Sequence, residues 1–122
     1  MWWLVVACAQ GPVDLQGSTA NGVRTVDSRA LEQTIARAPV RLVDVRTPRE
    51  FASGHVAGAV NLPVDTLAGH LDELPKDEEV WVVCESGARS LGASRLLAQR
   101  GYHPVDVSDG MRGWRAHGFP TE

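Results

Sequence analysis

Residues 80–90 of this 122-residue chain read VWVVCESGARS, and within them an apolar run gives way to small and polar residues. The apolar run that ends at Cys84 is typical of a strand buried on both faces of a parallel sheet. From Leu91 on, apolar residues recur at helical spacing, and Arg100-Gly101 supplies a basic last turn followed by a C-terminal stop. These residues therefore predict a strand, a polar loop and a helix, in that order.

The loop between this strand and helix favours chemistry at Cys84. Small and polar residues leave many backbone N–H groups free, and such a loop at a helix N-terminus is suited to bind an anion. Helix N-termini and nearby cations also favour the thiolate form of cysteine, so we expect Cys84 to be nucleophilic at neutral pH. Arg89 would sit in the first turn, where a cation opposes the helix dipole unless it binds an anion. The alternative is that Cys84 is a small hydrophobe that ends a buried strand.

The spacing of Cys84 and Arg89 separates two kinds of cysteine chemistry. Four residues lie between them, and Val83 precedes the cysteine. The signature of cysteine phosphatases has one more residue in the loop and usually a histidine before the cysteine. A phosphatase or arsenate reductase is therefore the less favoured interpretation.

Three motifs, in this order along the chain, resemble those of single-domain rhodaneses, the thiosulfate sulfurtransferases. The first is LVDVR at residues 42–46, followed by EFASGHVAGAVNLP at residues 50–63. The second is the loop CESGARS at residues 84–90, and the third is DGMRGWRAHGFP at residues 109–120. Together they cover about residues 23–120, so the resemblance predicts a rhodanese-like domain over residues 23–122.

The resemblance implies an enzyme that transfers sulfane sulfur. The donor would be thiosulfate or a persulfide, the intermediate a persulfide on Cys84, and the acceptor cyanide, a small thiol or a thiol protein such as a thioredoxin. It implies no cofactor. Members that handle thiosulfate often carry a cation directly after the cysteine, so Glu85 predicts weaker thiosulfate binding here. The predicted site comprises catalytic Cys84, the substrate-binding loop of Glu85, Ser86, Gly87, Ala88, Arg89 and Ser90, and two supporting residues, Asp44 and Arg46.

Within this site, Asp44 is expected to hold loops together by hydrogen bonds to backbone or to an arginine rather than to transfer protons. A rival to the enzyme is a non-catalytic rhodanese-like binding or sulfur-carrier module. Such modules commonly lack the cysteine, and this chain has Cys84. His55 lies in a turn between Gly54 and Val56 and is expected to be a hydrogen-bonded structural residue rather than a base.

Composition excludes other classes of function. The formal net charge is −3, which gives no basic surface for nucleic acid. The two cysteines and four histidines are scattered along the chain without metal-ligand spacing, so no metal site is expected. The sequence does not indicate an oligomeric state.

The first 22 residues are predicted to be an apolar segment followed by a flexible linker. Residues 1–9 are apolar but far shorter than the ~20 residues that span a bilayer. Val5-Val6-Ala7-Cys8 resembles a bacterial lipobox, in which Cys8 would carry a lipid anchor. This favours a cell-envelope or periplasmic location over a cytoplasmic one. The alternative is a ragged start with a chance cysteine.

Strand and helix patterns alternate along the rest of the chain. Strands are expected at residues 23–26, 40–45, 59–62, 80–83 and 104–107, and helices at residues 28–38, 48–52, 67–74, 91–100 and 111–117. The run Thr47-Pro48-Arg49-Glu50 reads as a capping box with proline at the first helical position. This alternation predicts an α/β three-layer sandwich with a mainly parallel sheet of about five strands. Ligands in such sheets bind beyond the carboxyl ends of the strands, where Cys84, Arg46 and the Asp109-Gly110 turn should meet.

Overall fold

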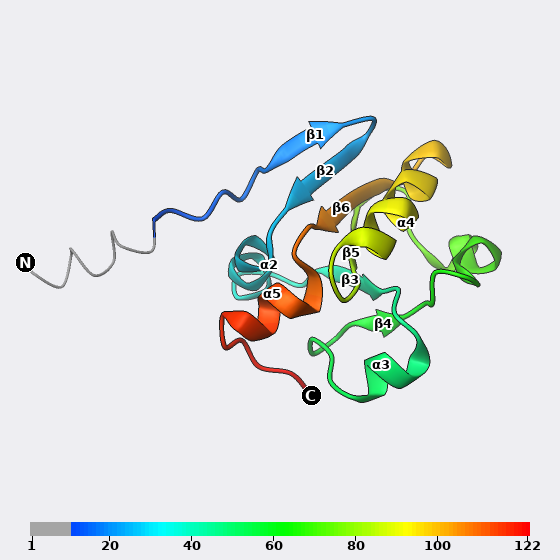
Figure 1. The fold of residues 1–122 in the computed structure, drawn as a ribbon. Helices are drawn as coiled ribbons and strands as arrows, with labels where there is room; N and C mark the ends of the chain where they lie inside the picture. The colour runs from blue at the N-terminus through cyan, green and yellow to red at the C-terminus, as the bar shows by residue number, and fades with distance from the viewer. Residues whose placement is uncertain (1–10) are drawn as a thin grey trace, which may run out of the picture.

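The computed structural model describes residues 11–122, so the predicted lipid anchor at Cys8 lies outside the described residues. A single sheet runs through the molecule in the strand order β1-β2-β6-β5-β3-β4, with helices around it (Figure 1). All neighbouring strands are parallel except β1 and β2, which form an antiparallel pair. Among the described helices, none combines the length and the apolar character needed to cross a bilayer.

The structure confirms the predicted alternation and adjusts its boundaries. The predicted helix at residues 67–74 is a 3₁₀ helix, and the helix after Cys84 begins at Ala88, so Arg89 lies in its first turn as predicted. In chain order the elements are β1 Ser18–Ala20, β2 Val23–Val26, α2 Ser28–Ile35, β3 Arg41–Asp44, α3 Pro48–Ala52, β4 Val60–Asn61, η1 Leu67–Glu73, β5 Glu79–Val83, α4 Ala88–Gln99, β6 His103–Val107 and α5 Gly110–Ala116.

Alternate residues of the central strand β5 face two separate apolar cores. Val80 and Val82 pack with η1 and with the apolar face of α4, which includes Leu97. Trp81 and Val83 pack on the other side with residues of α2 and α5, including Trp114. Because helices cover both faces, the continuous apolar run of β5 is buried on both sides. The three-layer prediction is therefore confirmed.

The N-terminal hairpin departs from the prediction. Residues 18–20 belong to the predicted linker, yet they form β1, so the sheet has six strands rather than about five. The cause is the turn Asn21-Gly22, in which both residues have positive φ, 54° and 79°. Two such residues make the turn that suits the twist of a two-residue hairpin. Val13 and Leu15 also pack against the core on the α2 side, so the chain is ordered well before residue 23.

The carboxyl ends of three neighbouring strands bring the predicted site together. Asp44 is the last residue of β3, Cys84 directly follows β5, and Ser108 directly follows β6. In the sheet β5 lies between the other two, so the cysteine is in the middle. This is the edge at which ligands bind in open parallel sheets.

Candidate active site

The sulfur of Cys84 lies inside the turn that begins α4. Its Sγ accepts a hydrogen bond from the amide of Gly87 at 3.1 Å and another from the amide of Ser90 at 3.3 Å. The Cys84 residue itself is 0% exposed. Two amides of the predicted loop therefore point at the sulfur, although the residue is more deeply buried than a surface nucleophile. Such donors stabilise a thiolate at a helix N-terminus.

Two glycines allow the loop to take this shape. Gly87 has a φ of 100°, and a Cβ built on it would lie 2.0 Å from the carbonyl oxygen of Ser108. Gly110 has a φ of 60°, and its Cβ would lie 2.5 Å from the carbonyl oxygens of Cys84 and Glu85. Any other residue at these positions would clash with backbone, so the loop packs directly on the turn after β6.

The N-terminus of α5 orients the loop from the other side. The amide of Met111 donates to the carbonyl of Cys84 at 2.8 Å, and the amide of Arg112 donates to the carbonyl of Glu85 at 3.0 Å. With these carbonyls turned toward α5, the loop can direct later amides at Sγ. Asp109 anchors the same turn, because its carboxylate accepts from both the amide and the hydroxyl of Ser28 at 2.8 Å. The predicted meeting of Cys84 with the Asp109-Gly110 turn is confirmed.

Arg89 binds a partner that the sequence did not reveal. Its guanidinium makes a bidentate pair with Glu50 of α3, at 2.7 and 2.9 Å. The hydrogen bonds from Arg89 are the main reason why the pKa of Glu50 falls to about 2. In turn, the bond to Glu50 raises the pKa of Arg89. The anion that Arg89 requires is thus supplied by the protein itself.

Glu50 is held by its own helix as well. Its backbone amide donates to the hydroxyl of Thr47, and its carboxylate accepts from the amide of Thr47 at 3.0 Å, which is the predicted capping box. One carboxylate therefore both caps α3 and fixes Arg89. The motif Thr47-x-x-Glu50 predicts only the first of these roles.

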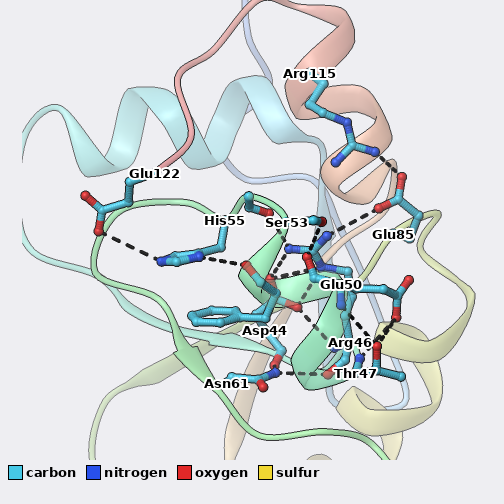
Figure 2. A network of polar contacts seen from close by, with 12 residues as sticks. Asp44, Arg46, Thr47, Glu50, Ser53, His55, Asn61, Glu85, Arg115 and Glu122 are labelled. Carbon is cyan, nitrogen blue, oxygen red and sulfur yellow. Dashed lines mark hydrogen bonds and ion pairs between the residues drawn. The ribbon is translucent and has the colours of Figure 1, made fainter.

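Asp44 and Arg46 form a buried pair beneath the loop (Figure 2). The Asp44 carboxylate accepts from Nε of Arg46 at 3.0 Å, from Nη2 at 2.8 Å and from the backbone amide of Arg46 at 3.0 Å. Burial alone would lower the pKa of Arg46. The hydrogen bonds to Asp44 and the negative charge of Asp44 outweigh burial, so the pKa of Arg46 is raised. Nη2 of Arg46 also donates to the carbonyl of Gly54 at 2.8 Å. These contacts fit the predicted loop-holding role of Asp44.

Glu85 is bound by two arginines. Its carboxylate accepts from Nη1 of Arg46 at 3.4 Å and from the guanidinium of Arg115 on α5 (Figure 2). Arg115 was not among the predicted site residues, because on the sequence it is one polar position on a short helix. Its contact with Glu85 links α5 to the outer side of the loop.

Two further side chains have structural roles near the site. Asn61 donates through Nδ2 to the carbonyls of Asp44 and Arg46, at 3.0 and 2.9 Å. The ring of His55 stacks on Phe51 with 3.8 Å between centroids, and Nδ1 lies 2.9 Å from the carbonyl of Phe51. No group of three or more His, Cys, Asp or Glu among residues 11–122 could hold a metal ion.

Comparisons with known proteins agree with this geometry. The sequence model of the rhodanese-like domain matches residues 27–117. A curated protein named sulfurtransferase, from Allochromatium vinosum, is 41% identical over 100 residues, which are 80% of this chain and 94% of that one.

Two solved structures resemble the fold closely. A rhodanese-like domain protein from Staphylococcus aureus superposes with a TM-score of 0.72 at 33% identity, covering 74% of this chain and 89% of that one. A human single-domain sulfurtransferase superposes with a TM-score of 0.69 at 30% identity, covering 75% of this chain and 95% of that one. Because the matched residues span most of its length, this chain belongs to the rhodanese-like domain family, among the single-domain sulfurtransferases.

Proposed function

We propose that this protein moves sulfane sulfur from thiosulfate or a persulfide donor, through a persulfide on Cys84, to cyanide or a thiol acceptor. The observation that carries the proposal is the pair of amide hydrogen bonds, from Gly87 and Ser90, to the sulfur of Cys84. They are directed at the sulfur atom that carries the negative charge of the free thiolate, and that regains this charge when the outer sulfur passes to the acceptor. A cofactor has no part in this scheme.

The two steps conserve atoms and charge. The Cys84 thiolate attacks the outer sulfur of thiosulfate, an S–S bond forms as the S–S bond of the donor breaks, and sulfite leaves with the electron pair. A persulfide donor reacts in the same way and releases its thiolate. In the second step cyanide or an acceptor thiolate attacks the outer sulfur, and Cys84 leaves as a thiolate. Amides that already point at Sγ of Cys84 stabilise it as the attacking thiolate in the first step and as the leaving thiolate in the second, without reorganisation.

The charges around the loop favour a donor with little negative charge. Three of the arginines near it are already paired: Arg46 binds Asp44, Arg89 binds Glu50 and Arg115 binds Glu85. A thiosulfate dianion would have to compete with these carboxylates for a guanidinium. This supports a persulfide donor over thiosulfate.

Mass spectrometry of the intact protein tests the proposal. After incubation with thiosulfate, or with a small-molecule persulfide, the wild-type chain should gain the mass of one sulfur atom and lose it again on addition of cyanide. Cys84→Ser should gain none. Cys8→Ser is the matched control, since the chain contains two cysteines, and it should load sulfur as the wild type does.

The same experiment distinguishes the rival functions. A wild-type protein that gains no sulfur from either donor would refute the proposal and leave a rhodanese-like binding module. Turnover of p-nitrophenyl phosphate that Cys84→Ser abolishes would instead indicate a cysteine phosphatase.

A further inference from the structure

Glu50 is a charged residue beside the active loop that the sulfur-transfer steps do not use. It comes from α3, yet its carboxylate accepts from the guanidinium of Arg89 through both oxygens, at 2.7 and 2.9 Å. Arg89 lies in the first turn of α4, between Gly87 and Ser90, whose amides hold Sγ of Cys84. A carboxylate from a different helix therefore occupies the cation of the active loop.

Exposure decides which guanidinium of the site a dissolved anion can meet. The side chain of Arg46 is buried, whereas those of Arg89 and Glu50 are partly exposed. Arg115 is exposed as well, but it lies on α5, at the outer side of the loop. The hydrogen bond to Glu50 is the largest cause of the raised pKa of Arg89, and the charge of Cys84 also contributes. Arg89 thus combines access from solvent with electrostatic contact with the nucleophile.

Glu50 is a strong competitor for Arg89 because it is held in place. Its Oε1 accepts from the amide of Thr47 at 3.0 Å and from the hydroxyl of Thr47 at 3.2 Å, so the capping box keeps the carboxylate oriented. A group on the same chain competes as if it were dissolved at about millimolar concentration or above. An anion from solution has to overcome this competition and also loses the entropy of association.

The two classes of donor differ in their need for a cation. Thiosulfate is a dianion, and its oxygens are the group that a guanidinium would bind. A persulfide can present its outer sulfur without such a group. We propose that Glu50 is a specificity-determining residue: by occupying Arg89 it disfavours anionic donors such as thiosulfate and leaves persulfides as the preferred class. The identity of the donors rests on the proposed function, whereas the competition between Glu50 and a dissolved anion does not.

Nuclear magnetic resonance tests this competition with sulfate, an unreactive dianion of similar size to thiosulfate. Sulfate is titrated at constant ionic strength, and binding is followed at the backbone amides of Gly87 and Ser90. Glu50→Gln keeps an oxygen that can cap α3 but removes the charge. Sulfate should therefore bind at least about tenfold more tightly than to the wild type, as expected for one freed charge-assisted hydrogen bond. In Glu50→Gln/Arg89→Gln this gain should disappear.

Glu79→Gln is the matched control. Glu79 also binds an arginine through both oxygens, because Arg24 donates to it from Nε and Nη2. It begins β5, at the opposite end of that strand from Cys84, so the variant has the same change in net charge and should bind sulfate as the wild type does. The proposal is wrong if Glu50→Gln binds sulfate no better than the wild type, if Glu79→Gln gains as much, or if the gain survives the loss of Arg89.

Steady-state kinetics tests the consequence for the donors. In Glu50→Gln the KM for thiosulfate should fall about tenfold. The KM for the persulfide of cysteamine, whose ammonium group offsets the charge on its sulfur, should change little. An equal fall for both donors would overturn the assignment of specificity. Sulfate binding requires no sulfur transfer, so a protein that loads no sulfur but gives the sulfate result refutes the proposed function alone, and one that loads sulfur without the sulfate result refutes this inference alone.

Discussion

Two arginine–carboxylate pairs flank the active loop, and they differ mainly in burial. The side chains of Arg46 and Asp44 are 1% and 0% exposed, whereas those of Arg89 and Glu50 are 36% and 34% exposed. Both pairs are bidentate. The comparison shows how the same chemical contact can serve two tasks, depending on how much water reaches it.

Burial decides what each pair contributes. Breaking a buried pair leaves an uncompensated charge in the protein interior, which typically costs about 3–5 kcal/mol. An exposed pair is screened by water and contributes about 0–1 kcal/mol. We therefore expect the Asp44–Arg46 pair to contribute strongly to the stability of the fold. The Glu50–Arg89 pair should set the charge near Cys84 with little effect on stability.

The largest effect is expected for Asp44→Ala. It removes the carboxylate that accepts from the backbone amide, Nε and Nη2 of Arg46 and leaves the guanidinium buried, so the free energy of unfolding should fall by about 3–5 kcal/mol. Urea unfolding measures this loss. In the double variant Asp44→Leu/Arg46→Met no buried charge is left, and most of the lost stability should return. A loss below about 1 kcal/mol for Asp44→Ala would show that both pairs behave like exposed ones.

Local sequence rules predicted the strand and the helix near the buried pair, and they led to the expectation that Asp44 bonds to backbone or to an arginine. The apolar run before Cys84 and the capping box from Thr47 to Glu50 each depend on residues close together in the chain, and both occur as expected. Asp44 and Arg46 are two residues apart at the end of a strand, so their proximity could also be predicted. The hairpin turn Asn21-Gly22 also depends only on adjacent residues. The small and polar residues around it are typical of a linker, so the hairpin was not predicted.

The partners of Arg89 and Arg115 at the edge of the site could not be predicted in this way. Glu50 and Arg89 are 39 residues apart, and they meet only because α3 and α4 follow the neighbouring strands β3 and β5. Arg115 meets Glu85 for a similar reason, through the docking of α5 on the loop.

A smaller effect is expected from reversing the charge at Glu85. In Glu85→Arg the carboxylate that binds Arg46 and Arg115 is replaced by a cation, so the KM for thiosulfate should fall about tenfold, or ~1.4 kcal/mol. Steady-state kinetics at low salt measures this change, and added salt should reduce it because the residue is partly exposed. Glu85→Gln should lower the KM less. An unchanged or higher KM would mean that the negative charge of Glu85 does not limit thiosulfate binding.

The smallest effect is expected for the exposed pair and appears only as a dependence on pH. Because the folded-state pKa of Glu50 is lowered to about 2, its contribution to stability is complete above its ordinary pKa of about 4.5 and is lost as the pH falls toward 2. Glu50→Gln should therefore reduce the free energy of unfolding by at most about 1 kcal/mol at pH 6, and the difference from wild type should vanish as the pH is lowered. Urea unfolding at several pH values measures this.

Arg89→Gln should abolish most of the same pH dependence, because the bonds from Arg89 are the main cause of the lowered pKa of Glu50. If the difference between Glu50→Gln and wild type persists in acid, the contribution of Glu50 comes from capping α3 rather than from its charge pair, and the contrast between the two pairs would then lie in local structure instead of burial.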